Sequence, residues 1–310
     1  MDFTTTLFNV LICLVYIIPG FLLCKFKKVS ADHLSTMSTI LVYVCGPCMI
    51  ISSFVAVDYS LSGFANMGLF ALITLVLQIV FMLFVFLILR KKYDDAKYRI
   101  FTIGAVLGNV GFFGLPVVKA LLPNSPEAMC YSSVYVLTMN ILVFTFGVYC
   151  LTRDKKYMSI KAAILNPTTL SLFVAVPLYL TGAKNYIPLM VINCVDLLGK
   201  MTTPLCMLIL GIRLGVVDLK KLFVRPIIYL LCFTKMVFFP LFCYLCVRFF
   251  PLDYSFKASI LILSSVPCAS VILNLAEIHH AEEELAANCV LISTLLCFIT
   301  IPLVSLFLYL

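Results

Sequence analysis

One stretch of the chain combines residues that interrupt a helix with a polar side chain at the interruption. It contains four glycines, a proline and an asparagine, Gly104, Gly108, Asn109, Gly111, Gly114 and Pro116. Glycine costs about 1 kcal/mol and proline about 3 kcal/mol in a helix interior, so we expect this helix to unwind near its middle. The new helix N-terminus would favour an anion, and the Asn109 amide can donate to a carboxylate or accept from a hydroxyl. The alternative is a glycine-lined packing face, which requires neither Pro116 nor Asn109.

A weaker copy of this pattern lies in the second half of the chain. Small and hydroxylated residues surround a second proline in the run Ser264-Ser265-Val266-Pro267-Cys268-Ala269-Ser270-Val271, and Asn274 follows one turn later. We therefore predict a second broken helix at Pro267. If both breaks cross near the membrane midplane, then Gly108, Asn109, Gly111, Gly114 and Pro116 face Pro267, Cys268, Ser270 and Asn274 across one binding site.

Three charged residues interrupt otherwise apolar stretches: Asp196, Lys200 and Lys235. A charge at the centre of a membrane helix costs roughly 2.5–3.5 kcal/mol, so each is a functional candidate. Asp196 and Lys200 are spaced to pair on one helix face. They form either a structural ion pair or a source of positive potential from Lys200 with Asp196 as a coupling switch. Lys235 snorkels, supports its helix against the broken helix at Pro267, or faces the anion path.

The elements that position these residues are membrane helices. The composition is 63% hydrophobic and 12% charged, which excludes a soluble domain. Eight stretches without Asp, Glu, Lys or Arg are long enough to cross about 30 Å of hydrocarbon, and two more contain the charges above. Together they predict an all-α integral membrane protein with ten transmembrane helices: Phe3–Cys24, His33–Val57, Tyr59–Leu89, Ile100–Val118, Ala128–Thr152, Ala162–Ala183, Ile187–Ile212, Pro226–Val247, Ala258–Ala276 and Leu285–Leu310.

Loop charges and proline spacing predict the arrangement of these helices. Most of the 22 Lys and Arg residues lie in the loops that follow odd-numbered helices. This bias places those loops in the cytoplasm and both termini outside. Pro47 and Pro116 recur as Pro204 and Pro267 at a similar separation. We therefore expect two inverted five-helix repeats, residues 1–155 and 156–310, an organisation typical of secondary transporters although also found in channels.

With these residues in place, the sequence resembles the auxin efflux carrier family, which includes plant PIN proteins and many bacterial permeases. The resemblance covers essentially the whole chain. Its most specific part is Gly108-Asn109-x-Gly111-Phe112-x-Gly114-x-Pro116, with further matches at Thr203-Pro204-Leu205 through Gly211, Pro267, Ala276-Glu277, Ser293-Thr294-Leu295-Leu296 and Thr300-Ile301-Pro302-Leu303. The short loop after the fifth helix resembles the bacterial permeases.

The resemblance implies a fold similar to bile-acid/sodium symporters. Helices 1, 2, 6 and 7 would form a scaffold, and helices 3–5 and 8–10 would form an elevator-like transport domain with crossed helices 4 and 9. Asn109 would contact a substrate carboxylate. Bacterial relatives often carry an asparagine where this chain has Val271. Ser270 or Asn274 would then replace that contact.

These observations predict a carrier of a small organic anion in the cell membrane. The expected substrates are malate-like or malonate-like acids or an indole carboxylate, with coupling to protons or sodium and a homodimer left open. The runner-up is a sodium-coupled symporter of the bile-acid type. We expect no cofactor, no metal, no nucleic-acid partner and no enzyme activity. An intramembrane enzyme using the cluster His279–Glu284 is the alternative from another class, although the cluster lacks H-E-x-x-H spacing.

Overall fold

The computed structural model describes residues 3–216 and 225–309, and within them it contains helices and no β-strand. Seven stretches are long and apolar enough to span a membrane, among the described residues: His33–Val55, Leu61–Lys92, Pro126–Thr152, Lys155–Leu180, Leu189–Val216, Pro226–Val247 and Glu283–Leu308. The predicted all-α membrane class is therefore confirmed. The count of ten spans and their inverted repeat remain predictions.

In the first half of the chain, the structure divides several predicted spans into shorter helices. The elements are α1 (Phe3–Lys25), α2 (His33–Ile40), the π-helical turn η1 (Leu41–Cys45), α3 (Gly46–Val55), α4 (Leu61–Leu89), α5 (Ala96–Gly104), the π-helical turn η3 (Val110–Gly114), α6 (Leu115–Leu121), α7 (Pro126–Leu142), the π-helical turn η4 (Val143–Gly147) and α8 (Val148–Thr152). Short 3-10 turns at Arg90–Lys92 and Lys155–Tyr157 lie in the connections.

The second half of the chain is also divided into shorter helices. Its elements are α9 (Ile160–Ile164), α10 (Pro167–Leu180), the 3-10 turn η6 (Ala183–Asn185), α11 (Leu189–Lys200), α12 (Thr202–Val216), α14 (Pro226–Phe233), the π-helical turn η7 (Thr234–Phe238), α15 (Phe239–Val247), α16 (Tyr254–Ser265), α17 (Ser270–Ile278), α18 (Glu283–Ser305) and the 3-10 turn Leu306–Tyr309.

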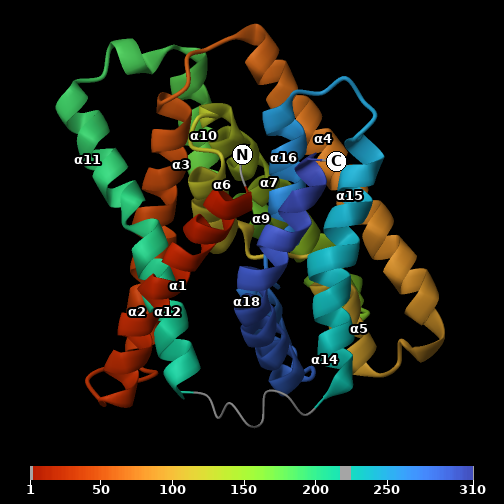
Figure 1. The fold of residues 1–310 in the computed structure, drawn as a ribbon. Helices are drawn as coiled ribbons and strands as arrows, with labels where there is room; N and C mark the ends of the chain where they lie inside the picture. The colour runs from red at the N-terminus through yellow and green to blue at the C-terminus, as the bar shows by residue number, and fades with distance from the viewer. Residues whose placement is uncertain (1–2, 217–224, 310) are drawn as a thin grey trace.

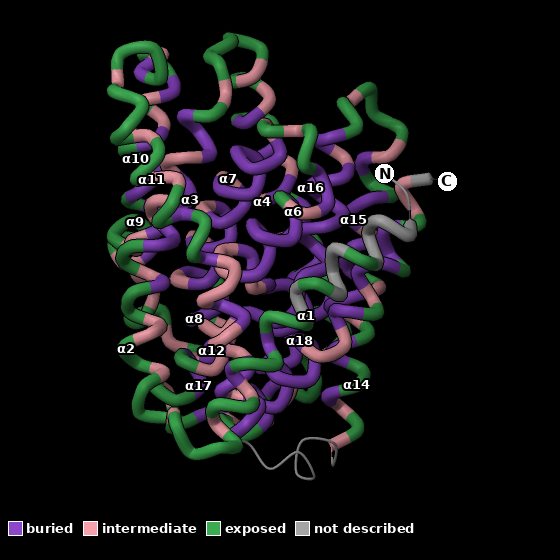
Figure 2. Tube along the Cα trace, turned by 60° about the vertical axis from the view of Figure 1, so that its left-hand side comes forward, coloured by how far each residue is buried: buried purple, intermediate pink, exposed green. Residues whose placement is uncertain are grey.

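The helices pack in two groups. In one group, α1 packs along α12, and α3 packs between α10 and α11. In the other, α4 packs on α7, and α16 packs on α7, α15 and α18. Figure 2 shows that buried residues concentrate in the second group, whereas the outer helices of the first expose long stretches. Such apolar exposure is what a lipid surface requires.

Glycines allow α1 and α12 to approach closely. A Cβ placed on Gly20 would overlap the carbonyl of Leu208, and a Cβ on Gly211 would overlap the carbonyl of Ile17. Small residues that let two backbones meet are the usual basis of helix association in membranes, because apolar side chains gain nothing by leaving lipid. This contact therefore fixes the position of α12, which carries part of the site described below.

The basic connections lie at one end of the molecule. In Figure 1, the connection from α1 to α2, the end of α12, the start of α14 and the connection from α4 to α5 all lie at the lower end. The connections from α3 to α4, from α10 to α11 and from α15 to α16 lie at the upper end. The geometry is consistent with the predicted separation of odd-numbered and even-numbered loops.

Candidate functional site

Two helices are interrupted where the sequence predicts it, and their breaks are joined by backbone hydrogen bonds. The first helix ends at Gly104 and resumes at Val110, and the second ends at Ser265 and resumes at Ser270. Gly108 and Cys268 form an isolated antiparallel bridge. We call this pairing of the two breaks the crossing.

Two hydrogen bonds flank that bridge and satisfy backbone groups that the breaks release. The Asn109 N–H donates to the Pro267 carbonyl at 2.8 Å, and the Ala269 N–H donates to the Leu107 carbonyl at 3.0 Å. Unpaired backbone N–H and C=O groups at membrane depth are costly, and here the groups released by one break pair with those released by the other. The Cys268 N–H donates to Ser293 Oγ at 3.0 Å, which ties the crossing to α18.

The prolines fit this arrangement for local steric reasons. Pro267 has no N–H to lose, and the preceding Val266 adopts the extended ψ of 155° that proline favours in its predecessor. Pro116 lies in the first turn of α6, where proline is well tolerated. The continuous helical stretch Val110–Leu121 and the helix α17 therefore both begin at the crossing.

The two helix N-termini at the crossing carry the polar side chains expected of an anion site. Asn109 immediately precedes η3, and Ser270 is the first residue of α17. The first N–H groups of a helix have no partner within it, and its dipole places partial positive charge there. Two N-termini from different helices thus face the same region.

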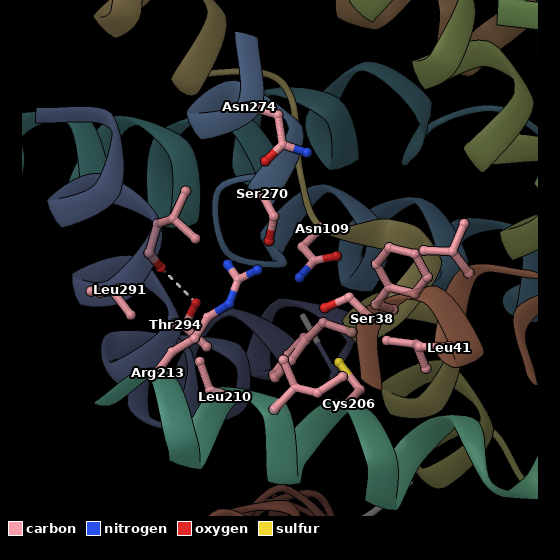
Figure 3. A pocket seen from close by; sticks show the side chains of 15 residues that line it. Ser38, Leu41, Asn109, Cys206, Leu210, Arg213, Ser270, Asn274, Leu291 and Thr294 are labelled. Carbon is pink, nitrogen blue, oxygen red and sulfur yellow. Dashed lines mark hydrogen bonds between the residues drawn. The ribbon is translucent and has the colours of Figure 1, made fainter. Parts of the chain in front are cut away.

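A cavity of about 140 Å³ lies between the crossing and the helices α2, α12 and α18. Its walls combine these polar and apolar residues: Ser38, Leu41, Val42, Asn109, Phe112, Phe113, Cys206, Ile209, Leu210, Arg213, Ser270, Asn274, Val290, Leu291 and Thr294. Figure 3 shows the guanidinium of Arg213 reaching from α12 toward Asn109 and Ser270. We call this space the Arg213 cavity.

A second cavity of about 280 Å³ adjoins the first and shares part of its lining with it. It is lined by Val42, Gly108, Asn109, Gly111, Phe112, Val136, Met139, Asn140, Phe144, Asn166, Thr168, Ala269, Ser270, Val271 and Asn274. Within it, Asn140 Nδ2 donates to Thr168 Oγ1 at 3.2 Å. Asn109, Ser270 and Asn274 line both cavities, so a ligand at the crossing can contact all three.

Arg213 is the cation that sequence reasoning missed. Because Arg213 follows directly after an apolar stretch, the sequence predicts that it belongs to a basic loop. The structure places it in the last turn of α12, half-buried on the cavity wall. Within residues 3–216 and 225–309, its guanidinium has no hydrogen-bond or ion-pair partner. Gly211 and Gly215 pack against α1, and Arg213, two residues from each, lies on the opposite face of α12, which turns toward the cavity.

The predicted site residues divide into two groups in the structure. Asn109, Gly111, Ser270 and Asn274 line a cavity, as does Gly108. Pro267 and Cys268 build the bridge through their backbone and are buried, while Gly114 and Pro116 pack inside the protein. For this second group, the structure supports a role in shaping the site and shows no side chain in either cavity.

Asp196 and Lys200 lie on α11, away from the crossing. Lys200 Nζ and Asp196 Oδ2 are 2.5 Å apart, and the side chains are 61% and 33% exposed. Neither residue lines the two cavities. This placement supports the ion-pair interpretation and gives no support to a Lys200 charge on the substrate path.

Lys235 contacts the broken helix at Pro267 and lies away from the walls of the two cavities. Its side chain is fully buried, and its ammonium donates to the Ser264 carbonyl at 2.7 Å. It lines neither of the two cavities. Of the three roles open from the sequence, contact with the broken helix at Pro267 is the one this geometry supports.

The acidic run Glu282–Glu284 lies at the start of α18 and pairs with a basic residue. Arg225 Nη1 contacts Glu282 Oε2 at 2.6 Å, and this hydrogen bond raises the pKa of Arg225. Glu283 and Glu284 occupy the first turn of α18, where carboxylates complement the helix dipole. These contacts explain the run without a metal or a catalytic role.

Comparisons with known proteins identify the family of the chain. The model of a family described as "membrane transport protein" matches residues 5–161 and 151–305. An uncharacterized transporter of Methanocaldococcus jannaschii is 24% identical over 95% of this chain and 96% of its own length. An uncharacterized transporter of Methanothermobacter thermautotrophicus is 22% identical over 96% of each chain. The family match covers nearly the whole sequence, and the chain therefore belongs to the membrane transport protein family of auxin efflux carrier-like permeases.

Proposed function

We propose that this protein is a secondary carrier of a small organic anion, with a carboxylate as the recognised group. The single observation that carries the proposal is the Arg213 guanidinium, which points from α12 toward Asn109 and Ser270 at two helix N-termini. Guanidinium and carboxylate match in a two-bond geometry, and helix N-termini add positive potential. Asn109 and Ser270 supply neutral donors to the same ligand.

The shape and the chemistry of the walls favour small acids. The two cavities measure about 140 and 280 Å³, and both are smaller than the roughly 300–1,000 Å³ typical of sites for drug-sized ligands. Malate-like or malonate-like acids therefore suit the site better than an indole carboxylate. Asn140, Asn166 and Thr168 in the second cavity offer partners for a hydroxyl or a second carboxylate.

A sodium-coupled symporter of the bile-acid type is the second candidate, and the lining of the two cavities offers it no carboxylate. A sodium site needs several oxygen ligands, which unwound backbone carbonyls supply in transporters with broken helices and to which a carboxylate can add negative charge. No described Asp or Glu lines either cavity. The carrier is therefore proposed to work without a carboxylate-based sodium site at the crossing.

The transport step is proposed to be an elevator-like motion between the two packing groups. The group of α1, α2, α3, α10, α11 and α12 would be the scaffold, and the remaining helices would move with the crossing. Support comes from the packing of α1 on α12 and of α16 on α7, α15 and α18. Because Arg213 lies on the scaffold and Asn109 on the moving part, this motion would change their separation and so couple substrate position to anion affinity.

The proposal also covers the topology and the membrane location of the chain. The chain would form ten spans in two inverted repeats, residues 1–155 and 156–310, in the cell membrane with both termini outside. A homodimer and coupling to protons stay open within it. The collection of basic connections at one end of the molecule supports this orientation.

Counterflow in proteoliposomes tests the proposed function. Vesicles loaded with unlabelled malate, malonate or indole acetate are diluted into the labelled acid, beside vesicles without protein. A carrier gives a transient accumulation of label above equilibrium for one acid and none in protein-free vesicles. A protein that only equilibrates label, without accumulation, behaves as a channel and would contradict the proposal.

A further inference from the structure

Lys235 is a fully buried cation that the proposed anion site does not use. Its side chain is 0% exposed, and it lies on the π-helical turn η7, between α14 and α15. Its Nζ also lies 4.8 Å from the centre of the Phe239 ring, within the range of a cation–π contact. Burial of an ammonium costs free energy, so the presence of a charged group at this position requires an explanation.

The ammonium contacts the negative end of one broken helix and the bridge that joins it to the other. It donates to the carbonyl of Ser264, in the last turn of α16. A Cβ on Gly108 would lie 3.0 Å from Nζ, so the ammonium is in contact with the bridge itself. The end of α5 lies at the other side of the bridge, where Cys268 Sγ donates to the Gly104 carbonyl at 3.5 Å.

The last carbonyls of a helix lack partners within it and carry partial negative charge. In transporters with broken helices, such C-terminal ends and unwound carbonyls form the sites of coupling cations, whereas the N-terminal ends bind anions. Here the N-terminal ends face the two cavities, and a side-chain ammonium lies at the opposite side of the crossing. No described carboxylate forms an ion pair with it.

We propose that the Lys235 ammonium is a built-in cation that occupies the position of a coupling metal ion at the crossing. It holds the C-terminal end of α16 against Gly108 in every transport state, so that no alkali ion needs to bind there. The part of this proposal that concerns coupling rests on the proposed carrier function. The part that concerns a cation position does not, because a vacated site can be tested without any substrate.

Chemical rescue of the purified protein tests the cation position. Lys235→Ala removes the side chain beyond Cβ, and n-propylammonium has the atoms that are lost. Thermal unfolding in detergent is measured in n-propylammonium chloride and in choline chloride at equal ionic strength. We expect n-propylammonium to raise the Tm of Lys235→Ala saturably, by roughly 2 °C or more, and to leave wild type unchanged.

Met236→Ala is the matched control, because Met236 is the next residue on η7 and is also fully buried. Its cavity would be apolar, so its Tm should not distinguish the two salts. An equal rise in both variants, or none in folded Lys235→Ala, would overturn the proposal. Lys235→Met keeps the length without the charge, and a Tm equal to that of wild type would also overturn it.

Uptake measurements test the coupling. For whichever acid wild type transports, we expect the same initial rate in sodium and in choline media. We also expect Lys235→Met to lower the rate by roughly a factor of ten or more. Wild-type uptake that requires sodium would contradict the built-in cation and leave the carrier function intact. Absence of any uptake would count against the carrier function only, because the rescue experiment still decides the cation position.

Discussion

Arg213 combines a permanent positive charge with a position that no described acidic residue neutralises. A guanidinium half-buried in a membrane protein is costly unless a ligand or water satisfies its donors. Asn109 and Ser270 face it from the crossing, and their side chains also lack partners within the described part of the chain. Three unsatisfied polar groups around one cavity are therefore arranged for a ligand that accepts hydrogen bonds.

A charge series at Arg213 tests this interpretation. We expect Arg213→Ala to reduce anion uptake by roughly 10- to 100-fold, because one charge-assisted pair is lost. Arg213→Lys should retain part of the activity, since it keeps the charge and loses the two-bond geometry. Initial rates of counterflow, normalised to the amount of reconstituted protein, measure both.

The double variant Asp196→Asn with Lys200→Gln is the control for Arg213. It removes two charges together from the α11 surface, so no partner is left unpaired, and neither residue lines a cavity. Its uptake should match wild type. If the double variant loses activity while Arg213→Ala retains it, the anion is attracted by Lys200 and the site assignment is wrong.

Local patterns predicted some of these residues and not others. Asn109 and Ser270 could be identified because each adjoins a break that glycine or proline makes visible in the sequence. Arg213 could not, because a basic residue at the end of an apolar stretch is normally a loop anchor, and only the tertiary position of α12 turns it toward Asn109. Cys268 was predicted as a substrate contact because it adjoins the second break. The structure places it at that break, but its side chain is buried and lines neither cavity.

At the scale of elements, the crossing is held together by backbone hydrogen bonds between the two broken helices. The two hydrogen bonds between Asn109 and Pro267 and between Ala269 and Leu107 hold the broken helices in one register. Side chains have little room at the crossing, because a Cβ on Gly108 would lie 2.6 Å from Val266 Cγ2 and 3.0 Å from the Lys235 ammonium. Glycine is required there by close approach, not by an unusual φ.

The close approach predicts different outcomes for two neighbouring glycines. Gly108→Ala should destabilise the protein by roughly 1–3 kcal/mol through overpacking. Gly111→Ala should leave stability unchanged or slightly raised, since the nearest atoms to its Cβ are at 3.9 Å, an ordinary contact. Thermal unfolding of the two variants in the same detergent compares them directly. Equal loss of stability in both would show that the backbone pairing of the crossing is described incorrectly.

The breaks were predictable from the sequence, and their pairing was not. Glycine and proline have local effects on helix stability, so the interruption near Gly108 and at Pro267 follows from propensity. The bridge between Gly108 and Cys268 joins residues that are far apart in the chain, which local propensity does not encode. The π-helical turns, including the one that carries Lys235, also have no clear local signal.

At the scale of the molecule, the arrangement of connections agrees with an oriented membrane protein. The basic connections after α1 and α4 lie at one end with the end of α12 and the start of α14, and the connections from α3 to α4, from α10 to α11 and from α15 to α16 lie at the other. Cytoplasmic loops of membrane proteins carry an excess of Lys and Arg. Arg213 lies in the last turn of α12, which ends on the same side of the molecule as these connections, so in the proposed orientation the Arg213 cavity would lie nearer the cytoplasm.

Cysteine labelling of intact cells tests this orientation. Ser30→Cys lies in the connection from α1 to α2, and Tyr186→Cys lies in the connection from α10 to α11, where Tyr186 is 84% exposed. A membrane-impermeant maleimide added outside should label Tyr186→Cys above the wild-type background and leave Ser30→Cys unlabelled until the cells are opened. The reverse pattern would show that the protein is inserted the other way up.

The most direct test of the central claim is counterflow of labelled malate and malonate through wild type beside Asn109→Ala. Asn109 lines both cavities and adjoins the bridge, so its amide should contact the anion in any pose at the crossing. We predict accumulation of one acid by wild type and a loss of at least about tenfold in a folded Asn109→Ala variant. Unchanged transport by Asn109→Ala would contradict an anion site at the crossing of the two broken helices.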